Sequence, residues 1–356
     1  MQFLKKEGIT MNYAECIEAA RGRIGNYCKA CPECNGRACG SQMPGPGSKG
    51  VGDTAKRNYD KWKEIRVQMD TIAENRPVDT SLNLFGKSFK YPFFAGPVGA
   101  VQLHYGDCLN DISYNDILVS SCAEFGIAAF TGDGTDGNVM VAATKAIKNA
   151  NGLGIPTVKP WNIETIRKKM AMVQESGAFA VAMDVDAAGL PFLKNLDPPA
   201  GSKTVEELRE VAQAAGVPFI VKGVMTAKGA LKAKEAGAAA IVVSNHGGRV
   251  LDQSPATAEV LEDIAHAVDG SMKIFVDGGI RSGTDVFKAI ALGADAVIIA
   301  RPFVTAVYGG EREGVKSYID KIGGELEDTM KMCGVSSLGE ITRDCVWTPH
   351  DHTISF

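Results

Sequence analysis

Short apolar runs alternate with longer amphipathic segments from about residue 91 onward. The runs are nearly continuous in Val, Ile, Ala and Phe, which is typical of strands that are buried on both faces. The segments between them begin at capping residues such as Thr226 and Ser282 and stop near glycines such as Gly237 and Gly293. The pattern predicts eight strands, at residues 92–95, 127–131, 156–158, 179–184, 218–222, 239–244, 273–277 and 295–300.

One short pattern recurs at residues 176–181, 236–241 and 292–297. Each copy has a glycine at the expected end of a helix, followed by small residues that lead into a strand, and the spacing fits two strand–helix units each time. Eight such units in series close most naturally into a (β/α)8 barrel. An open doubly wound sheet is the alternative, but residues 95–100 form only a weak version of the glycine-rich loop that it needs.

The alternation divides the chain into two parts. Residues 91–356 are expected to form the barrel, with a C-terminal helix at 311–332 on its outside. Residues 1–90 are expected to form a cysteine-containing helical extension that packs on the barrel, with a helix at 54–69.

Composition narrows the class of protein. The chain has 356 residues, 45% hydrophobic, so it can bury a large core. The net charge is −4 and the Lys and Arg residues are scattered, which argues against a nucleic-acid partner. No apolar run approaches the ~18 residues that indicate a membrane span. The N-terminus lacks a signal-peptide pattern, so we expect a cytoplasmic protein.

Charged side chains gather where the predicted strands end. In a (β/α)8 barrel the catalytic groups come from the carboxyl ends of the strands and from the loops that follow them. The sequence therefore predicts one functional face. The residues that mark it are Lys159, Asp184, Lys222, His246, Arg249, Asp277, Arg281 and Arg301.

Two of these strand ends suggest specific chemistry. His246 and Arg249 are separated by two glycines, which brings an acid/base group and a fixed positive charge together in a way that suits a small carboxylate. Residues 277–281 contain Gly-Gly followed by Arg281, and Arg301 follows the last strand. Glycine N–H groups, a helix N-terminus and two arginines favour a phosphate ligand over a plain turn.

Residues 221–224, 244–249, 251–252 and 277–289 resemble the FMN-dependent α-hydroxy acid oxidase/dehydrogenase family, which includes lactate oxidase, glycolate oxidase and flavocytochrome b2. The resemblance is close from about residue 218 to 302, looser from 91 to 184, and nearly absent before that. It implies an FMN-dependent oxidoreductase that oxidises a small, lactate-like L-2-hydroxy acid to the 2-oxo acid.

The resemblance also implies roles for four catalytic residues. His246 would be the base that takes the hydroxyl or α proton of the substrate, and Asp184 would be the carboxylate that pairs with it. Lys222 would stabilise the negative charge of reduced flavin. Arg249 would hold the substrate carboxylate.

The same resemblance implies a wider set of contacts to FMN, with Gly279, Arg281 and Arg301 at its phosphate. The residues expected at the cofactor are Pro97, Val98, Lys159, Lys222, Ser244, His246, Gly247, Asp277, Gly278, Gly279, Arg281, Ala300 and Arg301.

The chain departs from the family at the third strand. The family has a glutamine and, two residues later, a tyrosine that helps to hold the substrate. Here the aligned segment is Lys159-Pro160-Trp161, which makes Trp161 a candidate substrate contact beside His246 and Arg249. This departure keeps open a reductase or isomerase that uses reduced flavin, and the N-terminal cysteines keep open a non-catalytic flavin or redox sensor.

Nine cysteines are many for a protein expected in a reducing compartment, and four of them form the motif Cys28-x-x-Cys31-x-x-Cys34-x-x-x-x-Cys39. The spacing favours a metal site, either an iron–sulfur cluster that exchanges electrons with FMN or a structural zinc. Free thiols or a disulfide are the alternative. The electron acceptor is left open among oxygen, a quinone and a redox protein, and the family resemblance suggests a homo-tetramer.

Overall fold

Eight parallel strands close into a barrel in the computed structural model, which describes residues 11–190, 193 and 200–352. Around the barrel the order is β10-β11-β4-β5-β6-β7-β8-β9, and β9 pairs with β10 to complete the ring. All eight predicted strands are confirmed, with ends that differ by up to two residues. Their bounds are β4 Phe93–Ala95, β5 Ala129–Thr131, β6 Gly154–Val158, β7 Val181–Asp184, β8 Phe219–Val224, β9 Ala240–Val243, β10 Lys273–Val276 and β11 Ala296–Ile299.

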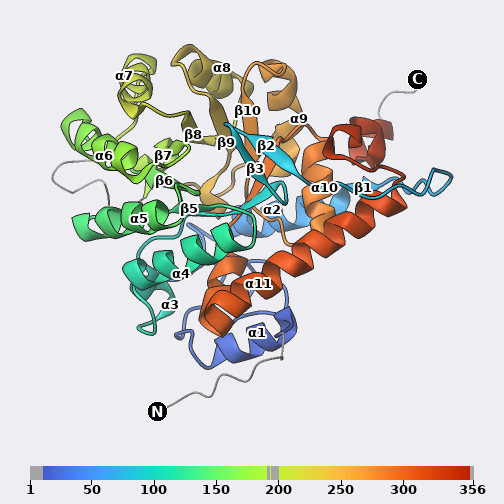
Figure 1. Cartoon of the computed structure of the whole chain (residues 1–356), viewed down its shortest axis with the longest axis horizontal. Helices are drawn as coiled ribbons and strands as arrows, with labels where there is room; N and C mark the ends of the chain where they lie inside the picture. The colour runs from blue at the N-terminus through green and yellow to red at the C-terminus, as the bar shows by residue number, and fades with distance from the viewer. Residues whose placement is uncertain (1–10, 191–192, 194–199, 353–356) are drawn as a thin grey trace.

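Helices surround the barrel (Figure 1). Thr226 and Ser282 cap α8 and α10, as predicted, each by accepting a bond from the backbone N–H three residues later. The bounds are α3 Val101–Tyr105, α4 Asp111–Glu124, α5 Gly137–Asn149, α6 Ile163–Ser176, α7 Val205–Ala215, α8 Ala227–Glu235, α9 Thr257–Val268, α10 Gly283–Ala291 and α11 Arg301–Met332. Short 3-10 turns are η1 Val185–Gly189, η2 His246–Gly248, η3 Leu338–Glu340, η4 Arg343–Cys345 and η5 Pro349–His352.

The C-terminal helix starts earlier than the sequence predicts. It begins directly after the last strand, at Arg301, with Pro302 at its first turn. The backbone breaks at Glu311, where φ is +48°, so the predicted 311–332 helix is the second part of α11.

Residues 11–90 pack against the barrel at three places. Helix α1, Tyr13–Arg21, lies against α11 (Figure 1), and α2, Asp53–Glu64, packs on η2 and α9. Helix α2 ends five residues earlier than predicted, because Ile65 turns to an extended backbone and leads into β1, Arg66–Val67, which pairs with β12, Val346–Trp347.

A hairpin that the pattern did not predict closes one end of the barrel. It consists of β2, Leu82–Leu84, and β3, Lys87–Phe89. Its Phe89 ring packs edge-on against Phe94 with centroids 4.9 Å apart, and the barrel interior continues with Phe130 and Phe275. The amino-terminal end of the barrel is therefore apolar and filled, which leaves the carboxyl end for chemistry.

Within the described ranges 11–190 and 200–352, no helix combines the length and apolar character needed to cross a bilayer.

Candidate active site

A cavity of about 280 Å³ opens at the carboxyl end of the barrel strands. Most of the residues expected at FMN or substrate line it: Pro97, Val98, Lys159, Lys222, His246, Gly247, Arg249, Asp277, Gly278, Gly279, Arg281, Ala300 and Arg301. The sequence pattern did not single out several further wall residues, among them His104, Tyr105, Thr135, Leu190 and Leu193.

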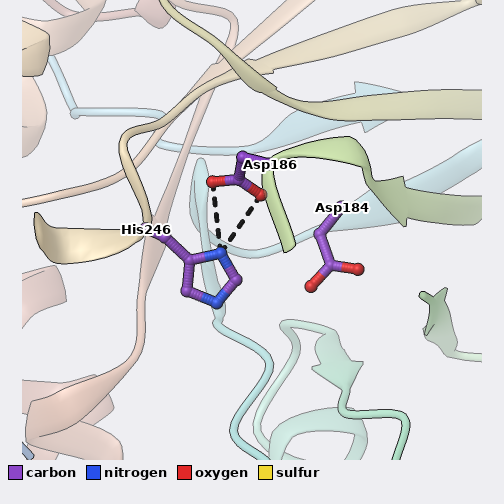
Figure 2. A group of neighbouring side chains, drawn as sticks. All are labelled: Asp184, Asp186 and His246. Carbon is purple, nitrogen blue, oxygen red and sulfur yellow. Dashed lines mark hydrogen bonds and ion pairs between the residues drawn. The ribbon is translucent and has the colours of Figure 1, made fainter. Parts of the chain in front are cut away.

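The histidine at the cavity is held by Asp186, so the prediction that Asp184 would pair with it is wrong. His246 Nδ1 lies 3.1 and 3.2 Å from the two carboxylate oxygens of Asp186, and Figure 2 shows Asp184 to one side, with no contact to the ring. A proton on Nδ1, shared with the carboxylate, leaves Nε2 as the acceptor on the other side of the ring. The arrangement gives His246 the tautomer of a general base.

Asp186 owes its position to the loop after β7 and to a glycine on the next strand. Asp184 is the last residue of β7, and Asp186 sits two residues further on, in η1. Gly223 faces it, and a Cβ there would lie 2.5 Å from the Asp186 Cγ. Burial raises the pKa of Asp186, but the charges of His246 and Lys222 outweigh that effect and hold the pKa below its ordinary value.

The turn after β9 presents His246 through an unusual backbone. His246, Gly247 and Gly248 have φ values of +56°, +62° and +82°, a left-handed run that a non-glycine residue adopts only when its surroundings fix it. Ser244 Oγ accepts the His246 N–H at 3.1 Å. Asn245 exchanges two side-chain hydrogen bonds, of 2.7 and 3.0 Å, with Asn58 of α2. The N-terminal extension thus helps to fix the turn that carries His246.

Lys222 is a buried cation inside the barrel mouth, 2% exposed. Its Nζ donates to Ser244 Oγ at 2.9 Å and lies 3.3 Å from Asp277 Oδ2. Burial lowers its pKa, yet the carboxylates around it, Asp277 first among them, raise the pKa to about 12. Lys222 therefore keeps its positive charge at any physiological pH, as a group that stabilises an anion must. Ser244 was expected at the cofactor, but it supports Lys222 and His246 and does not line the cavity.

A second carboxylate–cation pair occupies the other side of the barrel mouth. Lys159, directly after β6, places its Nζ 2.5 Å from Asp184 Oδ2. Their side chains are 14% and 2% exposed, so the ion pair is largely shielded from solvent. The second oxygen of Asp184 is buried without a hydrogen-bond partner in the described part of the chain.

Trp161 does not reach the cavity, which corrects its expected role as a substrate contact. It is 4% exposed, and its indole N–H donates to Asp133 Oδ2 at 2.8 Å. Asp133, which itself lines the cavity, also accepts a bond of 2.7 Å from Lys169, so the indole packs behind a wall residue instead of facing the ligand space. Because side chains alternate along β6, Lys159 falls on the same face as Thr157 and the interior residue Ile155, whereas Trp161 lies in the turn beyond the strand.

Arg249 lines the cavity and is fastened to the N-terminal extension. Its Nη1 donates to the carbonyls of Gly45 and Gly47, at 2.8 and 2.7 Å, and its Nη2 lies 3.2 Å from His104 Nε2. Burial, assisted by the charge of Arg301, lowers the pKa of Arg249 to about 10. The loop around residues 40–47 therefore orients the guanidinium that was expected to hold a substrate carboxylate.

The expected phosphate end lies where β10 and β11 finish. Gly278 and Gly279 have φ of +88° and +84°, and a Cβ on Gly279 would lie 2.1 Å from the Asn58 carbonyl oxygen, so α2 as well as the turn requires glycine there. Arg301 Nη2 donates to the Gly247 carbonyl at 2.8 Å, and Arg281 Nε donates to the Cys34 carbonyl at 2.5 Å. Both arginines line the cavity.

Comparison with known proteins identifies the family. The profile of the FMN-dependent dehydrogenases matches residues 46–195 and 195–348, which is most of the chain. The chain belongs to the FMN-dependent dehydrogenase family.

Two named relatives are peroxisomal (S)-2-hydroxy-acid oxidases of plants. The protein from Oryza sativa subsp. japonica is 46% identical over 329 residues, which cover 84% of this chain and 88% of that protein. A protein from Arabidopsis thaliana is 48% identical over 149 residues, 42% of this chain and 40% of that protein.

Solved structures agree on the fold. A flavocytochrome b2 variant superposes with a TM-score of 0.76 at 26% identity, covering 87% of this chain and 82% of that chain. A lactate oxidase described as putative, from Pediococcus acidilactici, gives a TM-score of 0.78 at 24% identity and 98% coverage of both chains, which is evidence of fold alone.

The cavity of this FMN-dependent dehydrogenase fits its cofactor. One residue of the cavity wall, Asp277, has a carboxylate oxygen, Oδ1, that is buried without a partner in the described part of the chain. An unpaired buried polar atom is costly, and the polar edge of a flavin ring offers a hydrogen bond of the kind that it lacks. Lys222 lies 3.3 Å from the other oxygen of Asp277, and Arg301 and Arg281 line the cavity at the expected phosphate end.

Sequence reasoning missed two groups that the structure brings to this site. Asp184 was predicted as the partner of His246, and Asp186 was not considered. The end of β7 distinguishes the two residues, because Asp184 is the last residue of the strand and faces the barrel. Asp186 lies in the loop that follows and can reach the turn after β9. His104 was set aside for lack of context, although it follows the first barrel strand, where functional loops begin. Burial, then the charge of Arg249, lower the pKa of His104 to about 4, so its ring is neutral at physiological pH.

Proposed function

We propose that this protein oxidises a small L-2-hydroxy acid to the 2-oxo acid with FMN bound in the cavity. The observation that carries the proposal is the His246–Asp186 pair, in which Nδ1 faces the carboxylate and Nε2 is the nitrogen on the other side of the ring, with Lys222 and Arg249 on the same cavity. The names of the rice and Arabidopsis relatives support the substrate class.

Each residue has a part in that reaction. FMN, when bound, would supply the acceptor of the two electrons and of the second hydrogen that leave the substrate. His246 Nε2 takes one proton from the substrate, and Asp186 stabilises the imidazolium that results. Arg249 orients the substrate carboxylate, and Lys222 stabilises negative charge at the cofactor. Leu190 and Leu193 provide an apolar stretch of wall for a short side chain.

The test is anaerobic bleaching of the bound flavin. The purified full-length protein is mixed without air with (S)-lactate, glycolate or (S)-mandelate, and with the (R)-enantiomers as controls. We expect loss of flavin absorbance near 450 nm with at least one (S)-acid or with glycolate. Bleaching by NAD(P)H together with no response to any 2-hydroxy acid would overturn the proposal in favour of a reductase.

Three further features of the protein are part of the proposal. The acceptor that reoxidises it is oxygen, a quinone or a redox protein, which anaerobically reduced enzyme mixed with each candidate would rank by rate. A homo-tetramer is testable by light scattering, and a cytoplasmic location by fractionation. The four cysteines at residues 28–39 hold a metal centre, an iron–sulfur cluster or zinc, because four thiolates suit both.

A further inference from the structure

His104 lies on the cavity wall between the N-terminal extension and Arg249. It belongs to the short helix α3 that follows β4, and it is 5% exposed. The Gly45 N–H donates to its Nδ1 at 3.0 Å, and its Nε2 lies 3.2 Å from Arg249 Nη2. Both His104 and Arg249 line the cavity. Each nitrogen of the His104 ring therefore faces a hydrogen-bond donor.

A neutral imidazole cannot accept a hydrogen bond at both nitrogens, because one of them carries the ring proton. Burial and the charge of Arg249 lower the pKa of His104 to about 4, so the ring is neutral at physiological pH. Nδ1 is the acceptor, because the backbone N–H of Gly45 meets it. The proton then lies on Nε2, where it faces a guanidinium that has donors only.

The loop that carries Gly45 fixes this tautomer. Gly45 has φ of +135°, a conformation that favours glycine, and a Cβ there would lie 3.0 Å from the Gln42 carbonyl oxygen. The Gly45 carbonyl also accepts from Arg249 Nη1 at 2.8 Å. The direction of the Gly45 N–H is therefore set by the loop, and the place of the His104 proton follows from it.

Arg249 has a positive charge that no carboxylate of the described chain balances. The groups that act on its pKa are burial, Tyr105, Arg301 and Cys39. Nη1 uses both of its hydrogens on the carbonyls of Gly45 and Gly47, which leaves Nη2 and Nε for a ligand. A partly buried cation of this kind is stabilised by a bound anion.

One oxygen of a ligand carboxylate would satisfy both His104 and Arg249. An N–H donor and an oxygen form an ordinary hydrogen bond at about 2.9 Å. Two nitrogens that are 3.2 Å apart can share an oxygen at that distance from each of them. A carboxylate also supplies the negative charge that Arg249 lacks, whereas a neutral hydroxyl or amide does not.

We propose that His104 donates its Nε2–H to the substrate carboxylate beside Arg249, so that the two side chains together form the carboxylate subsite of the cavity. The proposal rests on the proposed function, since it assigns a second contact to the carboxylate of the same substrate. His104 acts on affinity in this arrangement, and proton removal remains with His246.

Binding of oxalate, a carboxylate without an α hydrogen, tests the proposal in the full-length protein loaded with FMN. Flavin absorbance and calorimetry follow the titration. His104→Leu removes the donor, and we expect oxalate to bind about 10–100-fold more weakly, as for loss of a hydrogen bond to a charged group. His104→Gln keeps an acceptor and a donor and binds oxalate with nearly wild-type affinity. His266→Leu, the same change on the outer helix α9, is the matched control and binds oxalate as the wild type does.

A crystal structure of the oxalate complex separates direct contact from mere support of the loop. We expect one oxalate oxygen within hydrogen-bond distance of both His104 Nε2 and Arg249 Nη2. Oxalate bound to Arg249 without contact to His104, wild-type affinity in His104→Leu, or no binding to the wild type would each overturn the proposal. If the Leu variant does not fold, the structure of the wild-type complex decides alone.

Failure of the hydroxy-acid reaction has a separate signature. In that case no 2-hydroxy acid bleaches the flavin, while oxalate still binds to the wild type and binds more weakly to His104→Leu. Where a 2-hydroxy acid does bleach the flavin, His104→Leu raises the substrate concentration that gives half-maximal reduction and leaves the limiting rate nearly unchanged.

Discussion

The two halves of the cavity rim are built in different ways. The half that follows strands β8–β11 carries Lys222, His246, Arg249 and Arg301. It is the part of the sequence in which the family resemblance is closest. The half that follows β4–β7 carries the Lys159–Asp184 ion pair, and the family resemblance places a glutamine and a tyrosine at the positions of Lys159 and Trp161. The halves meet where Asp186, from the loop after β7, holds the ring of His246.

The difference separates residues that would act in the reaction from residues that would shape the ligand site. Proton removal and charge stabilisation need fixed groups at fixed distances, and the base and the cations proposed for these steps all follow strands β8–β11. Under that proposal the β4–β7 half would shape the remaining part of the ligand site. We infer that a change in the first half abolishes turnover, whereas a change in the second alters stability or substrate preference.

The strongest way to break this comparison is His246→Gln. Loss of the base lowers the rate of anaerobic flavin reduction by about 10²–10⁴-fold, while FMN content stays at the wild-type level. His266→Gln, on the outer helix α9, is the matched control and keeps the wild-type rate. Near-normal reduction by the His246 variant would show that the β8–β11 half is not where the chemistry occurs.

Lys159→Met tests whether the β4–β7 half acts mainly on stability. The change leaves the carboxylate of Asp184 buried without its cation, which costs about 3 kcal/mol in the free energy of unfolding. Urea denaturation measures it. The double variant Lys159→Met/Asp184→Leu removes both charges and recovers much of the loss. If the double variant were as unstable as the single one, a cause other than the unpaired charge would be at work.

Asp186→Asn and Asp184→Asn compare two carboxylates two residues apart. Asp186→Asn no longer stabilises the imidazolium, so flavin reduction slows by about 100-fold, which is the order expected for an element of general base catalysis. Asp184→Asn has a smaller effect on that rate because Asp184 does not contact the ring. Stopped-flow reduction at saturating substrate measures both, and the reverse order would restore the assignment of Asp184 to His246.

His104→Gln gives the smallest effect and tests the link between Arg249 and the N-terminal extension. The pKa of His104 is lowered from 6.5 to about 4 in the folded protein, so the unfolded chain takes up a proton first as the pH falls. The stability that depends on neutral His104 is complete above pH 6.5 and declines between pH 6.5 and about 4. Glutamine has no such proton, so the variant loses less stability over that range in urea titrations. Parallel pH dependences of wild type and variant would contradict this.

The barrel and one half of its site could be predicted because their signals are local. Each apolar run is long enough to define a strand, and the order of eight such runs leaves few topologies. His246, Lys222 and Arg249 stand directly at strand ends, where position along the chain nearly fixes position in space. The same logic failed for Trp161, because the chain turns after β6 and Asp133 accepts its indole N–H inside the protein.

Contacts between distant segments could not be predicted in this way. The Asp186–His246 bond joins residues 60 positions apart. The carbonyls of Gly45 and Gly47 reach Arg249 across more than 200 residues. Neither the hairpin β2–β3 nor the packing of α2 on Gly279 has a periodic signature, since both depend on the shape of a surface that exists only after the barrel has closed.

The sequence by itself determined the eight strand–helix units, the functional face at their carboxyl ends and the cysteine spacing, because each depends on neighbours within a few residues. Tertiary structure alone decided which carboxylate holds the histidine, where the indole points and that the cysteine loop lies beside Arg281. Those outcomes depend on which side chains come together once the barrel has closed and the loops have packed on it. Residues that are far apart in the sequence make these contacts, so no local sequence pattern predicts them.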